Sequence, residues 1–184
     1  MTKVAILVGS LRKESFSRKI ANNVSTLFPN EVETKFISIG DLPLYNQDLD
    51  DDHTPASEWT RFREELKSCD AVLFVTPEYN RSVPGVLKNA IDIGSRPKTD
   101  SVWKEKPAAI ISNSPSNLSG FGANHHLRQS LVFFDMPIVQ QPEVYLANVA
   151  TLLDEDGKIK EDSTVQFLQS FVDKFVKLIK KHTH

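Results

Sequence analysis

The sequence predicts a three-layer α/β sandwich in which a parallel, doubly wound sheet lies between two layers of helices. Short apolar runs alternate along the chain with longer stretches of helical periodicity, and no repeat or long linker interrupts this alternation. Strands that alternate with helices form parallel sheets, because right-handed crossovers place helices on both faces of the sheet. We therefore expect five βα units and a single domain over residues 1–184.

The predicted strands differ in how deeply they are buried. The segment 3–9 is apolar at nearly every position, as is typical of a strand that is covered on both faces. The segment 32–39 alternates apolar with polar residues, which indicates a more exposed strand. The predicted strands occupy residues 3–9, 32–39, 70–76, 107–112 and 137–140.

The predicted helices show apolar residues at spacings of three and four. In the first helix Phe16, Ile20, Val24 and Leu27 define one face. Residues 41–55 are polar and are expected to form a loop. The remaining helices are predicted near residues 56–68, 84–93 and 124–134, and from residue 163 to the end.

Composition excludes several classes of protein. The chain has 22 basic and 24 acidic side chains, a formal charge of −2, which argues against a nucleic-acid-binding protein. The single cysteine, Cys69, excludes an internal disulfide and a cysteine-rich zinc site. Only five apolar residues, 4–8, precede Gly9, too few for a signal peptide or a membrane span. We expect a cytoplasmic protein with no membrane or nucleic-acid partner.

In doubly wound sheets ligands bind beyond the carboxyl ends of the strands. The loop after the first strand, G-S-L-R-K-E-S-F-S (9–17), offers hydroxyl groups and a guanidinium just before a helix begins. Helix N-termini and arginine side chains both favour phosphate. In the alternative interpretation, Ser15 or Ser17 caps the helix and Arg12 is solvated. Triphosphate and dinucleotide glycine motifs are absent.

The loop after the third predicted strand, T-P-E-Y-N-R-S-V-P-G (76–85), contains two prolines that stiffen its backbone. A stiff loop can hold N–H groups beside the edge of a flat heteroaromatic ligand. The alternative is an ordinary turn in which Tyr79 covers an edge of the core.

These two motifs, with 76–85 continuing as V-L-K-N-A-I-D (86–92), closely resemble the NADPH-dependent FMN reductase family. This family belongs to the flavodoxin-like superfamily and includes bacterial quinone, chromate and azo-dye reductases. The resemblance extends from Lys3 to about Tyr145. It implies a flavodoxin-like, five-stranded parallel sheet of order 2-1-3-4-5, and a homodimer or homotetramer.

The resemblance also implies which residues bind the cofactor FMN. The residues expected at its phosphate are Ser10, Arg12, Ser15, Phe16 and Ser17. The residues expected beside its ring are Pro77, Glu78, Tyr79, Asn80, Arg81 and, from the loop 112–116, Ser114. The chain departs from the family pattern at Arg81, where an aromatic is frequent, at 119–122, where an arginine is missing, and at His125, where tyrosine is common.

The implied activity is that of an FMN-dependent NAD(P)H oxidoreductase. NADPH, or NADH, would pass hydride to FMN, and two electrons would then reduce a quinone or another small electrophile such as free FMN, an azo compound or chromate. No side chain needs to act as nucleophile or base, so we expect no catalytic residue, and no metal ligand. One alternative is a flavodoxin-like electron carrier or flavin-binding module without nicotinamide chemistry. A receiver-type signalling domain would need a phosphoacceptor aspartate where Thr76 and Ser112 stand.

Four weaker signals have ordinary structural interpretations. The acidic run 48–53 is expected to be a solvated loop, because it lacks the spacing of a calcium loop. Adjacent His125 and His126 diverge on a helix, so we expect surface or interface packing there. Cys69 precedes a buried strand and is expected to be an inert, packed thiol. His182 and His184 lie at an end that is expected to fray.

Overall fold

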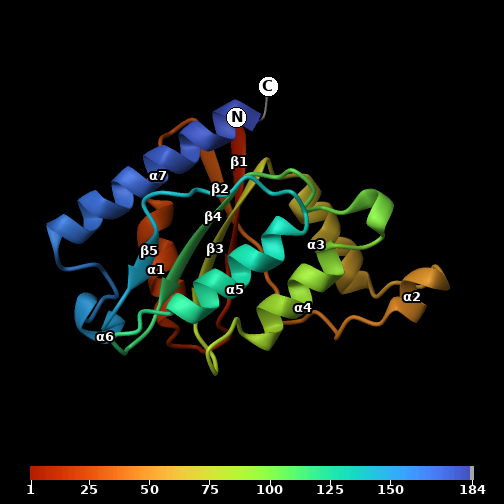
Figure 1. Cartoon of the computed structure of the whole chain (residues 1–184), viewed down its shortest axis with the longest axis horizontal. Coiled ribbons are helices and arrows are strands. Elements are labelled where there is room, and N and C mark those ends of the chain that lie inside the picture. The colour runs from red at the N-terminus through yellow and green to blue at the C-terminus, as the bar shows by residue number, and fades with distance from the viewer. Residues whose placement is uncertain (183–184) are drawn as a thin grey trace.

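The computed structural model describes residues 1–182, and in them five parallel strands form one sheet with helices on both faces (Figure 1). The strand order is β2-β1-β3-β4-β5, which confirms the predicted flavodoxin-like topology. The strands are β1 (Thr2–Val8), β2 (Val32–Phe36), β3 (Ala71–Pro77), β4 (Ala108–Asn113) and β5 (Val144–Leu146). The helices are α1 (Phe16–Ser25), α2 (Gln47–Asp51), α3 (Ser57–Lys67), α4 (Gly85–Gly94), the short 3-10 helix η1 (Lys98–Asp100), α5 (Phe121–Val132), α6 (Val149–Leu152) and α7 (Asp162–His182). His184, which the sequence analysis placed at an end expected to fray, lies outside the described residues.

Each face of the sheet carries its own hydrophobic core. Successive residues of a strand point to opposite faces, and accordingly Val4 and Ile6 of β1 belong to one core whereas Ala5 and Leu7 belong to the other. Helices α1 and α7 cover the first face, and α3, α4 and α5 cover the second.

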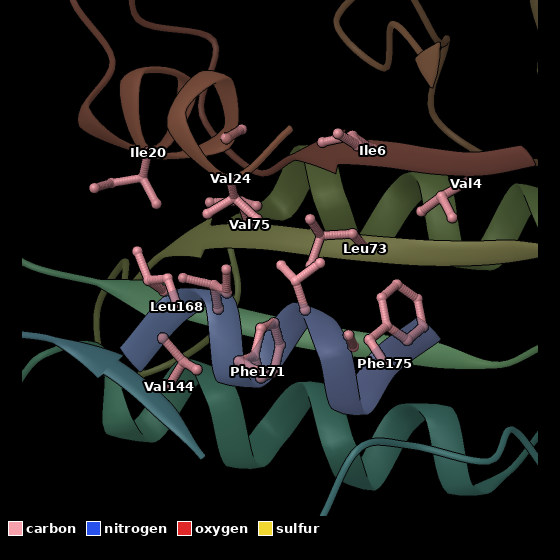
Figure 2. Close-up of a cluster of buried hydrophobic side chains, with 14 of the residues drawn as sticks. Val4, Ile6, Ile20, Val24, Leu73, Val75, Val144, Leu168, Phe171 and Phe175 are labelled. Atoms are coloured by element: carbon pink, nitrogen blue, oxygen red, sulfur yellow. The ribbon is translucent and has the colours of Figure 1, made fainter. Parts of the chain in front are cut away.

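Figure 2 shows side chains of α7 and α1 gathered against the strands of the first face. Phe171 and Phe175 of α7 are fully buried there. Truncating either ring to alanine would cost about 3–5 kcal/mol, because the removed surface is lost and a cavity is left behind. The helical stripe predicted after residue 163 is therefore core packing.

The strand order reverses direction beside β1, and this creates the place for a ligand. The crossover from β1 to β2 runs through α1 on one face, and the crossover from β2 to β3 runs through α3 on the other. Because the loops after β1 and β3 leave toward opposite faces, a crevice opens between them. The loops after β1, β3 and β4 lie together at the lower edge of Figure 1, opposite the start of β1.

Gly9 allows the ends of β1 and β3 to approach closely at this crevice. Its N–H donates to the carbonyl of Val75 (2.9 Å). A Cβ atom on Gly9 would lie 2.7 Å from the Thr76 hydroxyl oxygen. Any larger residue would therefore push the two strand ends apart.

The predicted fifth strand, residues 137–140, was wrong. This segment touches β4 only through one bridge, between Ile138 and Ala108. The true β5 pairs Val144 with Ile111 further along the chain. Pro142 lies between the two segments and has no N–H to donate to a ladder, so the bridge at Ile138 does not continue into β5 and the continuous pairing begins after Pro142.

The other differences concern the ends of elements. The loop predicted at 41–55 contains α2, whose first turn is capped by the side chain of Asn46 accepting from the N–H of Asp48 (3.1 Å). Strand β2 ends at Phe36 rather than at residue 39, and α5 begins at Phe121 rather than at residue 124. Within residues 1–182 no helix is long and apolar enough to cross a bilayer.

Candidate functional site

A cavity of about 210 Å³ lies where the loops after β1, β3 and β4 meet. The three loops come from three adjacent or nearly adjacent strand ends, so the cavity lies at the place that the topology predicts for a ligand. It is lined by Ser10, Arg12, Ser15, Phe16, Ser17, Pro77, Glu78, Tyr79, Asn113, Ser114 and Pro115. Nine of these are among the residues singled out in the sequence.

The first loop presents unpaired backbone donors at the start of α1. Ser15 is the N-cap of this helix, and its hydroxyl oxygen accepts from the N–H of Arg18 (3.1 Å). The N–H groups of Phe16 and Ser17 have no acceptor within residues 1–182. No acidic residue lies in the first turn, so the positive end of the helix dipole is not neutralised within the helix. This terminus is suited to an anion.

Arg12 adds a cation that has no partner of its own in the described part of the chain. It is exposed, and no acidic side chain within residues 1–182 lies within ion-pair distance of its guanidinium. By contrast, Lys19 in the same region is held by Glu14 at 2.9 Å. The Arg12 side chain therefore remains able to bind a ligand at the cavity that it lines.

The floor of the cavity is a buried pair of polar side chains, Ser17 and Asn113. Their exposed fractions are 1% and 2%. The side-chain amide of Asn113 donates to the Ser17 hydroxyl (2.9 Å) and to the carbonyl of Thr76 (3.3 Å). Asn113 was not among the predicted site residues, although a polar residue ending an otherwise apolar strand is a signal that could have identified it.

The second loop forms a tight hairpin. Tyr79 and Ser82 exchange two backbone hydrogen bonds, both of 3.0 Å. The residues between them, Asn80 and Arg81, have positive φ angles of 50° and 67°, as both central residues of a type I′ turn do. Neither Asn80 nor Arg81 lines the cavity. The structure thus places these two predicted site residues in the turn, beyond the cavity wall.

The third loop closes the remaining side. The N–H of Ser114 donates to the carbonyl of Leu146 on β5 (3.0 Å), and its hydroxyl accepts from the N–H of Ser116 (3.1 Å). Gly120 ends this loop with a φ angle of +76°, and a Cβ atom there would lie 2.9 Å from that of Ser112. Only glycine fits this conformation and this contact without strain.

Both histidines that the sequence singled out make specific contacts outside the cavity. His126 Nδ1 lies 2.9 Å from the hydroxyl of Ser82, at the hairpin. His125 Nε2 lies 3.0 Å from the hydroxyl of Tyr145, and Phe121 packs against both of these rings. Burial, with a smaller effect of Glu143, raises the pKa of Tyr145 to about 12.

The acidic run 48–53 is not simply a solvated loop, as the sequence had suggested. Asp50 forms two hydrogen bonds with the guanidinium of Arg63, at 2.7 and 2.8 Å. No group of three potential metal ligands occurs among the described residues. Cys69 is buried, and burial raises the pKa of its thiol, which agrees with the expected inert character.

Comparison with known proteins assigns the chain to a protein family. Residues 2–151 match the NADPH-dependent FMN reductase family. The chain belongs to this family. The resemblance seen in the two loop motifs is thereby confirmed, and with it the expected activity class, an FMN-dependent NAD(P)H oxidoreductase.

Relatives within the NADPH-dependent FMN reductase family cover nearly the whole chain. A quinone reductase of Pseudomonas putida is 57% identical over 177 residues, which are 96% of this chain and 94% of the relative. A 2-hydroxy-1,4-benzoquinone reductase of a Burkholderia species is 42% identical, over 94% of this chain and 93% of its own. The solved structure of FerB, a flavoenzyme NAD(P)H:(acceptor) oxidoreductase from Paracoccus denitrificans, has a TM-score of 0.91 and 40% identity, and each chain covers 99% of the other.

Proposed function

We propose that this protein is a quinone reductase whose FMN is held by the loops after β1, β3 and β4. The observation that carries the proposal is a cavity lined by Arg12, Phe16 and Ser17, where two backbone N–H groups and a guanidinium have no partner among residues 1–182. The similarity to two enzymes named for quinone reduction supports the choice of acceptor. NADPH or NADH is the proposed electron donor.

The residues at the cavity fit the two ends of FMN. A phosphate would accept from the N–H groups of Phe16 and Ser17, from the hydroxyl of Ser10 and from the Arg12 guanidinium. The ring would lie between the loop 77–81 and Ser114, with Pro77, Glu78 and Tyr79 at one side and the turn residues Asn80 and Arg81 beyond them. When bound, FMN supplies hydride acceptance and donation, which no side chain of the protein can provide.

The size of the cavity indicates how substrates reach the cofactor. At about 210 Å³ it is smaller than the ~300–1,000 Å³ of pockets that enclose a whole ligand. We infer that the phosphate end is enclosed while one face of the ring stays open for the nicotinamide and then for the quinone. The protein's own part is to orient this open face, since correct placement of reactants supplies a large part of the rate.

The proposal includes the setting in which the enzyme works. We propose one FMN-binding domain over residues 1–184, acting in the cytoplasm on a small-molecule acceptor, as a homodimer or homotetramer. Exposed apolar side chains near both ends of α5 support self-association: Leu118, Phe121, Val132 and Phe133 have exposed fractions of 50%, 54%, 69% and 82%.

The test is a visible spectrum followed by an anaerobic titration. The purified protein, supplied with FMN, is expected to show flavin absorbance, to be bleached by NADPH without oxygen, and to regain its colour on addition of 1,4-benzoquinone. A protein that refuses FMN at micromolar concentration would refute the site. A protein that binds FMN but is bleached only by one-electron donors would be an electron carrier instead.

A second measurement tests the acceptor. Steady-state rates with 1,4-benzoquinone, free FMN, an azo dye and chromate are compared at equal NADPH. The quinone is expected to give the highest kcat/KM. A higher value for any of the other three acceptors would overturn the quinone assignment while leaving the flavin site intact.

A further inference from the structure

The carboxylate of Glu78 is the cap of a helix that begins far away in the sequence. Its Oε2 accepts from the N–H of Ala123 (3.1 Å), the third residue of α5, across 45 positions of the chain. The residue before α5 is Gly120, which has no side chain to cap the helix. The Glu78 side chain is only 10% exposed, and its carboxylate lies at the N-terminal end of the helix, the position that a cap occupies.

The same carboxylate also faces the turn of the hairpin that follows it. Its Oε1 lies 3.6 Å from Nη1 of Arg81, whose side chain is 72% exposed. Arg81 holds a φ angle of +67°, a conformation that costs energy for a residue with a side chain. Surroundings must therefore hold the turn, and the ion pair with Glu78 is one such contact.

Gly122 makes this junction between α5 and the hairpin close enough for the hydrogen bond. A Cβ atom at position 122 would lie 2.8 Å from the carbonyl oxygen of Arg81 and 3.0 Å from Oε2 of Glu78. One of the two is backbone, which cannot swing aside as a flexible side chain can. The helix thus rests directly on the hairpin.

A second contact from α5 holds the other arm of the hairpin. His126 Nδ1 lies 2.9 Å from the Ser82 hydroxyl, one helical turn beyond the Ala123 contact. Ser82 is the residue that exchanges backbone hydrogen bonds with Tyr79. Both arms of the hairpin are therefore attached to the same helix.

We propose that Glu78 is a positioning residue: through its hydrogen bond to Ala123 it holds the hairpin 79–82 in the place where it borders the flavin ring. The N–H groups of Glu78, Asn80 and Arg81 have no acceptor within residues 1–182, so the hairpin offers donors to a ligand at a fixed position. The inference rests on the proposed function. In this proposal the Glu78 side chain binds helix α5, and the backbone N–H groups of the loop contact the flavin ring.

The experiment compares FMN with riboflavin, which has the same ring but no phosphate. In Glu78→Ala the dissociation constants of both flavins are expected to rise by the same factor, about 10-fold, the scale of one lost helix cap. Glu78→Gln, whose side-chain carbonyl can still accept from Ala123, is expected to restore both affinities to within about twofold. Fluorescence quenching titrations give all the constants.

Two further readouts separate positioning from simple loss of stability. Hydrogen exchange of the apoprotein is expected to quicken in Glu78→Ala at Tyr79 and Ser82, whose N–H groups are the hydrogen-bonded ones of the hairpin. The midpoint potential of the bound flavin is expected to shift. Gly122→Ala, which leaves Glu78 in place but crowds the junction, is expected to weaken both flavins in the same way. Glu155→Ala, at an exposed glutamate, is the control and is expected to change none of these quantities.

The outcomes are distinct from those that test the proposed function. If the unaltered protein binds FMN and Glu78→Ala binds both flavins equally well, the positioning role is wrong and the function stands. A loss confined to FMN, or a Glu78→Gln protein as weak as Glu78→Ala, would also overturn it. Failure of the unaltered protein to bind FMN would instead refute the proposed function.

Discussion

The side-chain amide of Asn113 donates a 2.9 Å hydrogen bond to the hydroxyl of Ser17, across 96 positions of the sequence. The same amide donates to the carbonyl of Thr76 at 3.3 Å. One buried group therefore joins the end of β4 to the start of α1 and the end of β3. The atoms that form the floor of the cavity therefore also connect these three elements.

Asn113→Ala is expected to destabilise the protein and to weaken FMN binding together. Losing the amide leaves two buried oxygens with fewer hydrogen bonds, which should lower the free energy of unfolding by about 2 kcal/mol. Urea unfolding of the apoprotein measures the change in the free energy of unfolding, and flavin titration measures the change in FMN affinity. Asn30→Ala, at an exposed asparagine away from the cavity, is the control and should stay within about 0.5 kcal/mol. An Asn113→Ala protein as stable as the control would contradict the role of this amide.

Arg12→Ala is expected to weaken FMN and to leave riboflavin unaffected. A charge-assisted hydrogen bond to phosphate contributes about 1.5–3 kcal/mol, so the dissociation constant of FMN should rise about 10- to 100-fold. Riboflavin has no phosphate and should bind as before. Lys13→Ala, one residue along and not lining the cavity, is the matched control. Equal weakening of both flavins by Arg12→Ala would show that this arginine does not meet the phosphate.

The pair Asp50 and Arg63 makes stability depend on pH. The hydrogen bonds from Arg63 hold the pKa of Asp50 below its ordinary value of 3.8, and burial opposes this shift. The resulting stabilisation is fully present above pH 3.8 and is lost as the pH falls through the lower pKa of the folded state. Asp50→Asn should therefore lower the free energy of unfolding by about 2 kcal/mol at neutral pH.

Urea unfolding at a series of pH values checks this expectation. The difference between the unaltered protein and Asp50→Asn should shrink as the pH is lowered below 3.8, because Asp50 then becomes neutral in both states. Asp51→Asn, at the exposed neighbouring carboxylate, should show no comparable difference. A constant difference between the unaltered protein and Asp50→Asn across the acid range would rule out the titration of Asp50 as its cause.

Cys69 is expected to resist modification while the protein is folded. The thiol is only 3% exposed, burial raises its pKa, and its sulfur lies 3.4 Å from the carbonyl of Glu65. Since the thiolate is the reactive form, a disulfide reagent such as dithionitrobenzoate should react at least about 10-fold more slowly with the folded than with the unfolded chain. Rapid reaction in the folded state would contradict this. Cys69→Ser is expected to keep full oxidoreductase activity.

The apolar runs predicted most of the sheet because burial on both faces leaves a strong signal. Residues 3–9 and 70–76 stand out in the sequence for this reason, and they form the central strands β1 and β3. The last strand is only three residues long and lies at the edge, so its signal was no stronger than that of residues 137–140. A short edge strand is identified by its partner, which the sequence does not show.

At the site, the loops could be predicted because topology alone places ligands at the ends of strands. Ser15 and Arg12 could be singled out because hydroxyl and guanidinium groups just before a helix favour phosphate, and the alternative, capping by Ser15, also holds in the structure. The tertiary contacts could not be predicted, since Asn113 meets Ser17, and Glu78 meets Ala123, only after distant segments have folded together. Such contacts produce no periodic pattern in the sequence from which they could be predicted.

The order of these segments along the chain bears on how the enzyme matures as it is synthesised. The cavity draws on residues as far along as Pro115, and its amide floor is Asn113. A nascent chain in which residues 113–115 have not yet left the ribosome can form only part of this cavity. If FMN binds here as proposed, its loading would be a late event in biogenesis, and translation products cut short before residue 113 should emerge colourless.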